Sequence, residues 1–521
     1  MPSGLLLFVV GLGLAMTHFL NARMGATVAM TVILAIAPLY AVSRLDRGIS
    51  DWRVGDGPII GAAVLLSALL AYGAAAVWPN SGDEYGYLYS PDTLLHGRFY
   101  NPPPPVQGLF DFFWIGMHDG KSASQYPPGW PAVLAAFKVA HLHRLANPAL
   151  VGVLGLLLSG CLKRLGVGSR TRRPLLALVL LSPFTIFNGA SLFSHLLAAV
   201  ATLGVCYLQL CDEQAPAFWK KAGIGAFMSL LLVTRHDSFV LLAILFAADR
   251  LTLRRLEILR DAPAFLIGGL PITAAWLHYN FAITGNPLVA TMRWAFPGFQ
   301  TLGIVHYRFA VTNTLDMAAL LFLFAGAVPV LLYGWALHAK LRRRAVRFYD
   351  LLLPAAFMLF IFYPHSPGHQ YGPRYWYFAW PCAALTIGPD LAAAGSAIAL
   401  AGRRFGLAEL TRRQLYLFAG FTIGFAVFLR MYVDERRAIY AVPVPETPAI
   451  VLVPDRHFVL VPWQIRPFLV ADMDMTRNGL NYDGKILYGR AEFAGAACAM
   501  TGYHLFVWRG PGPLEPVKCP G

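Results

Sequence analysis

The sequence predicts an all-α polytopic membrane protein that ends in a small mixed or β-rich domain outside the membrane. Of the 521 residues, 57% are hydrophobic and 13% are charged, and the mean hydropathy is +0.55. Soluble domains carry about twice that charged fraction. Many apolar runs approach the ~20 residues that cross a hydrocarbon core, and backbone that meets lipid must be helical. These runs stop near residue 432, where we place a domain boundary.

About thirteen apolar segments are long enough to be expected as transmembrane helices. They are 4–21, 25–43, 58–78, 147–163, 174–190, 192–211, 217–234, 237–250, 262–282, 315–338, 349–364, 372–391 and 414–432. No Lys or Arg precedes the first apolar core and no small-residue cleavage site follows it, so we expect a helix there and not a signal peptide. The stretch 127–145 is broken by prolines and basic residues, which favours a helix at the membrane interface.

The distribution of Lys and Arg indicates which ends of these spans face the cytoplasm. With the N-terminus inside, the inner loops hold 23 of the 42 basic residues, whereas the outer connections before residue 430 hold 9. Because cytoplasmic loops are enriched in Lys and Arg, this bias supports the orientation. The connections then expected to face the periplasm or exterior are 79–146, 283–314, 365–374 and the C-terminal tail.

The net charge of +15 raises the question of nucleic-acid binding. The basic residues lie in short loops between apolar runs, as the membrane orientation requires. No basic stripe alternates with aromatic residues in the way that a nucleic-acid groove needs. We therefore expect membrane lipids as partners, and no nucleic acid.

Residues 433–521 are expected to form the outer C-terminal domain, and residues 1–432 the transmembrane module with 79–146 as its first large outer loop. The tail contains short β-prone runs separated by turn residues, namely "AIVLVP", "HFVLVPW", "KILYG" and "HLFVWRG". Cys498 and Cys519 lie in this tail and can pair if it faces an oxidising compartment. The other four cysteines lie in or beside apolar runs, where packing is the ordinary role.

In the predicted orientation, polar residues from several separate segments fall on the outer face. The motif "GDEYGYL" follows the 58–78 span, and "SLFSHLL", "LLVTRHDSF" and "YPHSPGHQYGPRYW" lie at the outer ends of later spans. The orientation depends only on the basic loops, so this convergence is independent support for an outer site. The candidate residues are Asp83, Glu84, Lys121, Tyr126, His195, Arg235, His236, His369, Tyr371 and Arg374.

These residue types suit the transfer of a group from a lipid-linked phosphate. A carboxylate can remove the proton of an attacking hydroxyl, and Arg, Lys or His can stabilise charge on a phosphate leaving group. A lipid tail on the donor would explain a site at the edge of the bilayer. Two adjacent acids can have different tasks, and a carboxylate pair can hold a divalent metal. No cluster has a metal-ligand spacing, so the sequence leaves metal dependence open and indicates no required cofactor.

Each candidate also has an ordinary structural explanation. An acidic pair after a transmembrane helix is more often only solvated, and Arg235 can be an interfacial anchor. A single histidine such as His195 is more often a packing residue. The motif "YPPGWP" is at least a rigid turn that starts a helix, and prolines 102–105 suit a polyproline spacer.

The ordered motifs "GDEYGYL", "GRFYNPPPP", "SQYPPGWP", "LFSH", "TRHDS", "YNFAITGNPL" and "GPRYW" cover most of residues 58–391. Together they resemble the GT-C superfamily of polyprenyl-phosphate-sugar glycosyltransferases. The most similar branch is the bacterial one that groups protein O-mannosyltransferases, aminoarabinose transferases of lipid A and rhizobial lipopolysaccharide galacturonosyl transferases. Two spans precede the acidic loop here, where relatives commonly have one.

The resemblance implies a role for each matched residue. Asp83 would be the catalytic base with Glu84 assisting, and Arg235 and Arg374 would hold the donor phosphate. Aminoarabinose transferases have a lysine directly before the two prolines, where this chain has Tyr126, and the nearest lysine is Lys121. Lys121 is therefore a weaker candidate for the phosphate. The remaining residues would line the substrate site, and they are Tyr126, His195, His236, His369 and Tyr371.

The expected activity is that of an integral membrane glycosyltransferase. It would move a sugar from a polyprenyl-phosphate donor to a hydroxyl of a lipid, glycan or protein acceptor at the periplasmic face of the bacterial inner membrane, as a cell-envelope enzyme. A lipid-linked-sugar transporter or flippase is the alternative. Transporters place ionisable groups near the midplane, whereas here these groups gather at the outer ends of the spans. A non-catalytic binding subunit is a third hypothesis, which the intact Asp83–Glu84 pair disfavours.

Overall fold

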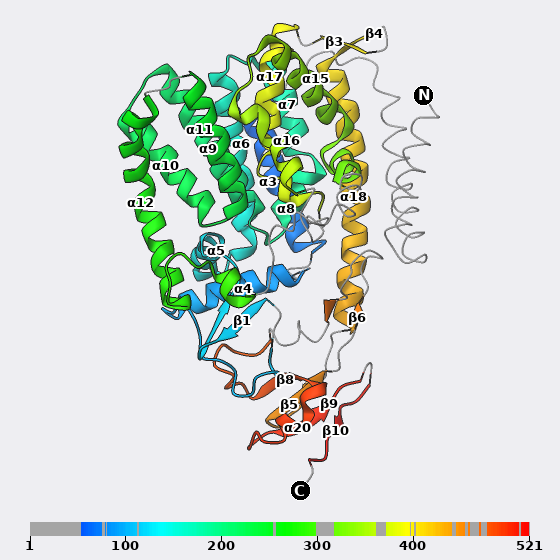
Figure 1. Ribbon diagram of the computed structural model, residues 1–521. Coiled ribbons are helices and arrows are strands. Elements are labelled where there is room, and N and C mark those ends of the chain that lie inside the picture. The colour runs from blue at the N-terminus through cyan, green and yellow to red at the C-terminus, as the bar shows by residue number, and fades with distance from the viewer. Residues whose placement is uncertain are drawn as a thin grey trace.

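The fold is a bundle of long helices with a small sheet domain at one end (Figure 1). This computed structural model describes residues 54–75, 79, 81–111, 114–253, 257–297, 317–360, 371–395, 397–400, 403–439, 444–453, 457–458, 468–469, 477–509 and 512–519. The predicted spans 4–21 and 25–43 and the candidate His369 lie outside these residues. We call the end of the bundle beside the C-terminal domain the sheet end, and the opposite end the basic-loop end.

The apolar segments within the described residues form helices, as the hydropathy predicts. The long or apolar helices are α3 (Asp56–Tyr72), α6 (Ala146–Arg164), α7 (Ser169–Leu180), α8 (Pro183–Ala190), α9 (His195–Gln214), α10 (Phe218–Leu232), α11 (His236–Leu253), α12 (Glu257–Thr284), the helix Met317–Ala325, α15 (Ala327–Arg343), α16 (Phe348–Phe360), α17 (Ala383–Ala393) and α18 (Leu407–Ile439). Two 3₁₀ turns, Arg374–Trp376 and Trp380–Cys382, lead into α17.

Within the described residues, fewer helices than the predicted count of about thirteen are long and apolar enough to cross a membrane. By length and composition, two described helices can each cross a membrane, His143–Arg164 and His195–Gln214. Two pairs of consecutive helices are long and apolar enough only when each pair is taken together, and each pair is bent at the break. The bend is 50° between α7 and α8 and 111° between Met317–Ala325 and α15. The described residues thus provide two spans, or four if each bent pair is one span, and the count of about thirteen is not confirmed. One bend has a local cause, since Ser182 caps α8 and Pro183 opens it.

Ion pairs tie the helices together at the basic-loop end. Arg347 pairs with both Glu213 and Asp249, which lie near the ends of α9 and α11. Further pairs join Asp56 to Arg172, Asp261 to Lys221 and Arg250, Asp350 to Lys340, and Asp390 to Arg343. Many cations that the sequence assigned to inner loops therefore also hold neighbouring helices in place.

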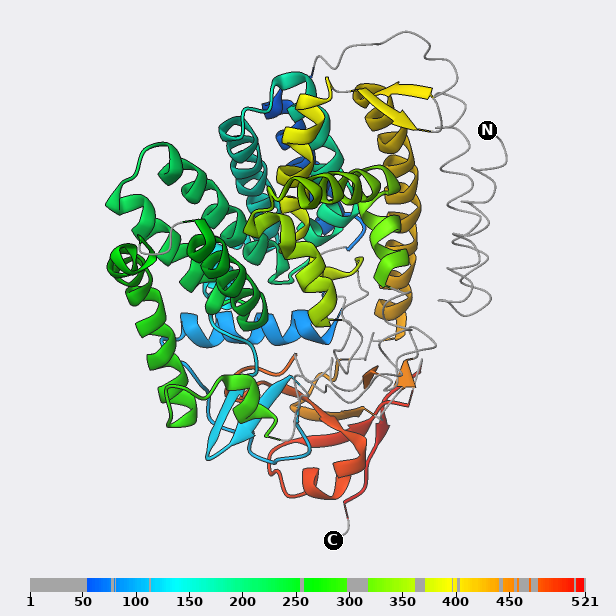
Figure 2. The same cartoon turned by 45° about the horizontal axis from the view of Figure 1, so that its top comes forward.

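The first large loop folds into structure that lies across the sheet end of the bundle. Helix α4 (Gly82–Leu95) runs crosswise between the long helices and the sheet domain (Figure 2). It is followed by the antiparallel hairpin β1 (Ile115–His118) and β2 (Lys121–Ser124), by α5 (Gly129–Val139) and by a 3₁₀ turn, His143–Leu145. The stretch 127–145 is thus largely helical, as predicted. Helix α13 (Thr291–Ala295) packs against the hairpin.

The C-terminal domain contains a four-stranded mixed sheet. Its order is β10 (Glu515–Pro516), β9 (His504–Val507), β5 (Ala449–Val453) and β8 (Ile486–Arg490), with β5 parallel to both neighbours. The apolar run "AIVLV" of β5 is buried along its whole length, as a central strand requires. The domain also contains the hairpin β6 (His457–Phe458) with β7 (Phe468–Leu469), the 3₁₀ turn Ala491–Phe493, and α20 (Ala494–Ala497). A further hairpin, β3 (Ala397–Leu400) with β4 (Arg403–Gly406), lies between α17 and α18 at the basic-loop end (Figure 1).

Cys498 and Cys519 form a disulfide in this domain. Their Cα atoms are 5.6 Å apart, which lies within the usual range for a disulfide. The bond ties α20 to the segment after β10. The four other cysteines, Cys161, Cys206, Cys211 and Cys382, are reduced and buried, as their apolar surroundings in the sequence predicted.

Helices α10 and α12 approach each other so closely that only glycine fits at their contact. A Cβ atom on Gly225 would lie 1.9 Å from the carbonyl oxygen of Phe265. A Cβ atom on Gly268 would lie 1.8 Å from the carbonyl oxygen of Ala222. Small residues at such contacts are typical of helices that pack in a membrane.

We therefore expect Gly225→Ala to separate α10 from α12. The overpacked contact should lower the free energy of unfolding by about 1–3 kcal/mol. Thermal unfolding of the detergent-solubilised protein, followed by circular dichroism, measures this change. Gly334→Ala is the matched control, because Gly334 is exposed on α15 and a Cβ atom there would have no heavy atom within 4 Å. Equal melting temperatures for the two variants would contradict the packing described.

Candidate active site

Asp83 lies at the start of α4 and accepts hydrogen bonds from three different segments. Its Oδ1 accepts from the indole Nε1 of Trp114 at 3.2 Å and from the hydroxyl of Tyr126. Its Oδ2 accepts from Nη2 of Arg374 at 2.8 Å. The Asp83 side chain is 28% exposed, so the carboxylate is fixed by its donors and still accessible.

The local sequence explains why Trp114 can reach Asp83. The indole lies directly against the first turn of α4, where a Cβ atom on Gly82 would be 2.0 Å from the ring. Ser81 caps the helix by accepting a hydrogen bond from the backbone N–H of Glu84. The glycine before the acidic pair is therefore required by the aromatic ring that holds the first acid.

Tyr126 remains a hydroxyl donor over the whole physiological pH range. Burial raises its pKa well above the usual value, and the negative charge of Asp83 raises the pKa further. The ring packs on Tyr87, with 4.1 Å between ring centroids. Thr291 donates a hydrogen bond to the neighbouring backbone carbonyl of Gln125 at 3.0 Å, which fixes this turn before α5.

The two arginines predicted to bind phosphate both lie near one aromatic ring, that of Tyr375. The guanidinium carbon of Arg235 is 4.7 Å from the ring centroid of Tyr375, and that of Arg374 is 5.6 Å from the same centroid. His195 also contacts Tyr375, with 5.4 Å between ring centroids. Asp237 pairs with Nη2 of Arg235 at 2.7 Å. Nε of Arg235 is buried and has no hydrogen-bond partner among the residues that the structure describes.

The structure thus unites Asp83, Tyr126, His195, Arg235 and Arg374. A carboxylate, two guanidinium groups and a neutral hydroxyl donor converge where crosswise α4 meets the ends of the long helices. Such a set can accept a proton and stabilise an anionic leaving group.

Solved structures resemble the chain over most of its length. ArnT from Cupriavidus metallidurans in the apo state gives a TM-score of 0.51 at 12% identity, covering 87% of this chain and 92% of that chain. ArnT bound to undecaprenyl phosphate gives 0.49 at 13% identity, covering 86% and 93%. The apo oligosaccharyltransferase of Archaeoglobus fulgidus gives 0.43 at 12% identity, covering 75% and 62%. No protein-family model and no curated protein sequence matches the chain.

The chain has the GT-C fold. The resemblance expected from the order of the motifs is confirmed at this level. Within this GT-C fold, "GDEYGYL" begins the crosswise helix and "GPRYW" supplies both Arg374 and Tyr375. Two segments that are distant in the sequence therefore meet at Asp83.

Glu84 has a different environment from its neighbour. It is 1% exposed, and its Oε1 accepts a hydrogen bond from the backbone N–H of Leu192 at 2.7 Å. It also interacts electrostatically with the buried guanidinium of Arg144. Glu84 thus fixes the turn between α8 and α9, and a catalytic task for it stays a prediction.

Three other candidates face structural partners. Lys121 donates to the backbone carbonyls of Ala282 and Ile283, at 2.8 and 3.1 Å, near the C-terminus of α12. His236 packs on Trp276 of α12, with 5.4 Å between ring centroids. Tyr371 is buried with a left-handed backbone, at φ 62°, and its carbonyl accepts a hydrogen bond from Asn188. None of these contacts joins the three residues to Asp83.

Sequence analysis missed Trp114 and Tyr375 as site residues. Both are aromatic residues near a membrane interface, where an aromatic belt is the usual explanation. Only the adjacency of Tyr375 to Arg374 could have indicated its place. For metals, the described part of the chain contains no group of three or more His, Cys, Asp or Glu side chains that could hold an ion. Dependence on a divalent metal stays an open prediction.

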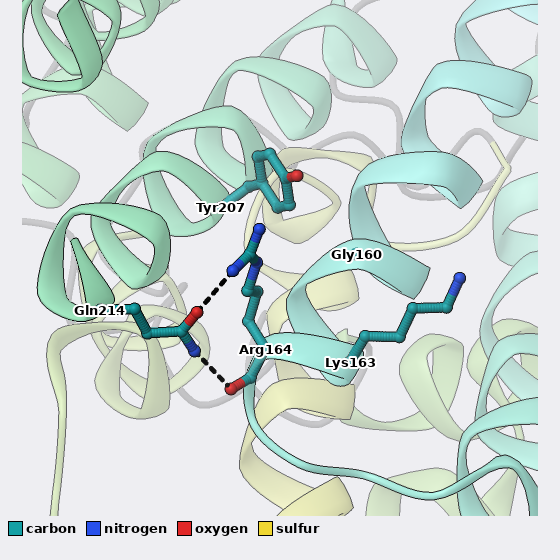
Figure 3. A pocket seen from close by; sticks show the side chains of 5 residues that line it. All are labelled: Gly160, Lys163, Arg164, Tyr207 and Gln214. Atoms are coloured by element: carbon teal, nitrogen blue, oxygen red, sulfur yellow. Dashed lines mark hydrogen bonds between the residues drawn. The ribbon is translucent and has the colours of Figure 1, made fainter. Parts of the chain in front are cut away.

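A separate hollow of about 500 Å³ lies at the basic-loop end, between α6 and α9 (Figure 3). Gln214 bonds there to both the guanidinium and the carbonyl of Arg164, at 2.6 and 3.1 Å. The other lining residues are Gly160, Lys163 and Tyr207. Since Asp83 lies at the sheet end, this hollow is distinct from the candidate active site.

We expect Glu84→Gln to reduce stability, because Gln keeps the acceptor for Leu192 but removes the charge beside buried Arg144. The free energy of unfolding should fall by about 1–3 kcal/mol. Thermal unfolding in detergent provides the measurement. Glu409→Gln is the control, because Glu409 is 40% exposed and makes a surface pair with Arg413, which is worth ~1 kcal/mol at most. An unchanged melting temperature for Glu84→Gln would contradict the structural role assigned to Glu84.

Proposed function

We propose that this chain is an integral membrane glycosyltransferase that moves a sugar from a polyprenyl-phosphate donor to a hydroxyl group of an acceptor. The observation that carries the proposal is the contact of Asp83 with Arg374, together with the Tyr375 ring that joins Arg374 to Arg235. A base and two fixed cations on one surface provide the two functions that the reaction needs: proton removal and stabilisation of the departing phosphate.

In this mechanism Asp83 is the general base. A carboxylate offers about four lone-pair positions, and the donors from Trp114, Tyr126 and Arg374 occupy three of them. The acceptor hydroxyl gives its proton to Asp83 while its oxygen forms a bond to the anomeric carbon of the sugar. The bond from that carbon to the phosphate oxygen breaks, and the phosphate leaves with the electron pair. A single displacement of this kind inverts the anomeric centre.

Arg235 and Arg374 would stabilise the phosphate as its charge develops. Arginine binds phosphate through paired N–H donors, and the buried Nε of Arg235 lacks a partner within the described residues. The neutral hydroxyl of Tyr126 stands where aminoarabinose transferases have a lysine. His195 would contribute to the wall of the site through its contact with Tyr375.

A lipid-borne donor agrees with the place of the site. Asp83 begins α4, which lies across the ends of the long helices (Figure 2), so a phosphate carried by a membrane lipid could approach along the bundle. ArnT, whose apo form shares this fold, has been crystallised with undecaprenyl phosphate. That ligand belongs to the class of polyprenyl phosphates proposed here. The acceptor would be a lipid, glycan or protein hydroxyl.

We place the protein in the bacterial inner membrane, with the site and the C-terminal domain facing the periplasm. The basic loops lie at the opposite end of the bundle, as the positive-inside rule requires for cytoplasmic loops. The Cys498–Cys519 disulfide supports an oxidising compartment for the sheet domain.

Asp83→Asn should reduce sugar transfer by about 10²–10⁴-fold, because the amide cannot take up the proton. The assay measures glycosylated product from a polyprenyl-phosphate sugar in proteoliposomes. Asp119→Asn is the control, because Asp119 is exposed at the tip of the β1–β2 hairpin at φ 51°, which asparagine also tolerates. Transfer by Asp83→Asn at the wild-type rate would refute the mechanism. A lipid transporter would instead move the donor across the bilayer and form no product.

Arg235→Ala should raise the KM for the donor by roughly tenfold or more, because a charge-assisted contact to phosphate is lost. Arg235→Lys should recover part of that loss, since it keeps the charge. Lys121→Ala provides the comparison: its ammonium binds carbonyls of α12, so the donor KM should not change. A larger KM effect from Lys121→Ala than from Arg235→Ala would reverse the assignment of the phosphate site.

A further inference from the structure

The C-terminal domain holds the first outer loop through Arg490, at the end of β8. The backbone N–H of Arg490 donates to the carbonyl of Leu109 at 2.9 Å. Its side-chain Nε and Nη2 both donate to the carbonyl of Asp111, at 3.2 Å each. Arg490 is only 9% exposed, so these bonds are protected from competition with water.

Apolar packing surrounds these hydrogen bonds. Leu109 and Phe110 are both fully buried. The ring of Phe110 lies 5.2 Å from that of Tyr482, measured between centroids. Gly108 has a left-handed backbone, at φ +83°, and a Cβ atom there would be 2.6 Å from the ring of Phe493. The loop and the domain thus fit together through residues of both.

The same loop leads directly to the candidate base. Three residues after Asp111, Trp114 lies on the first turn of α4 and donates its indole N–H to Asp83. The contact between Arg490 and Asp111 therefore fixes the chain on the N-terminal side of Trp114. On the C-terminal side, the β1–β2 hairpin, which begins at Ile115, fixes the chain.

We propose that Arg490 is a positioning residue, through which the C-terminal domain sets the place of Trp114 and hence of Asp83. The inference rests on the proposed function, because it concerns the same base. A loop that carries a catalytic contact is mobile unless a rigid element holds it. Misplacing a general base by about 1 Å can lower the rate of the reaction by up to about a hundredfold. The C-terminal domain is accordingly part of the catalytic unit.

The first experiment compares Arg490→Ala with Arg509→Ala in the full-length protein. Arg509 belongs to the same domain, but its side chain is 73% exposed and pairs with Glu515. Arg490→Ala should lower kcat by roughly tenfold and leave the donor KM unchanged, because the phosphate cations are not touched. Arg490→Lys should restore part of kcat, whereas Arg509→Ala should behave as wild type. Wild-type kcat for Arg490→Ala would overturn the proposal.

A double-mutant cycle tests the route through Trp114. Trp114→Phe removes the indole N–H that reaches Asp83 and keeps an aromatic ring. If Arg490 acts through Trp114, then adding Arg490→Ala to Trp114→Phe should lower kcat by less than about twofold, since coupled residues are not additive. Full additivity of the two losses would overturn the proposal, because it would mean that Arg490 acts independently of Trp114.

Hydrogen exchange separates this inference from the proposed function. If Asp83→Asn kept wild-type transfer, the general-base mechanism would fail, but the structural coupling would still be measurable. Arg490→Ala should speed amide exchange in the segment 109–118, and Arg509→Ala should not. Unchanged exchange in that segment would overturn the coupling whatever the activity assays show.

Discussion

The ion pair between Asp83 and Arg374 is the interaction on which the candidate site depends. It joins residues that are 291 positions apart in the sequence, so the first outer loop and a late turn of the bundle must both be in place before it forms. The pair also sets the chemistry, since one oxygen of the carboxylate faces the guanidinium and the other faces the two aromatic donors. Arg374 in turn stacks on Phe193, with 3.9 Å from its guanidinium carbon to the ring centroid. The turn between α8 and α9 therefore supports the same site.

The two ends of the bundle use charge in different ways. At the basic-loop end, ion pairs such as that between Lys340 and Asp350 are buried and connect helices. At the sheet end, Arg235 and Arg374 lie over aromatic rings, and the Asp83 carboxylate remains partly exposed. Arginine carries five N–H donors, so a guanidinium group that lies over an aromatic ring can also bind an anion. This difference is the physical reason for assigning the chemistry to the sheet end.

Part of this arrangement could be predicted from the sequence. Helices followed from apolar runs, and Asp83, Arg235 and Arg374 stood out because they fall on one predicted face of the membrane and match the ordered motifs. The bend between α7 and α8 was not predicted as a span break, because the apolar run 174–190 continues through Pro183. The different burial of Asp83 and Glu84 also could not be predicted. Adjacent helical residues point about 100° apart, and only the surrounding fold decides which of them is buried.

The contact between Arg490 and Asp111 has a consequence for how the protein is made. The two residues are 379 positions apart, and ribosomes add ~5–20 residues per second. The outer loop therefore waits on the order of 20–80 seconds before its partner strand has even been synthesised. During that time the loop lacks the surface against which Leu109 and Phe110 pack in the folded protein. Assembly of the candidate site is thus among the last steps of biogenesis, and a truncated chain would insert its helices without completing the site.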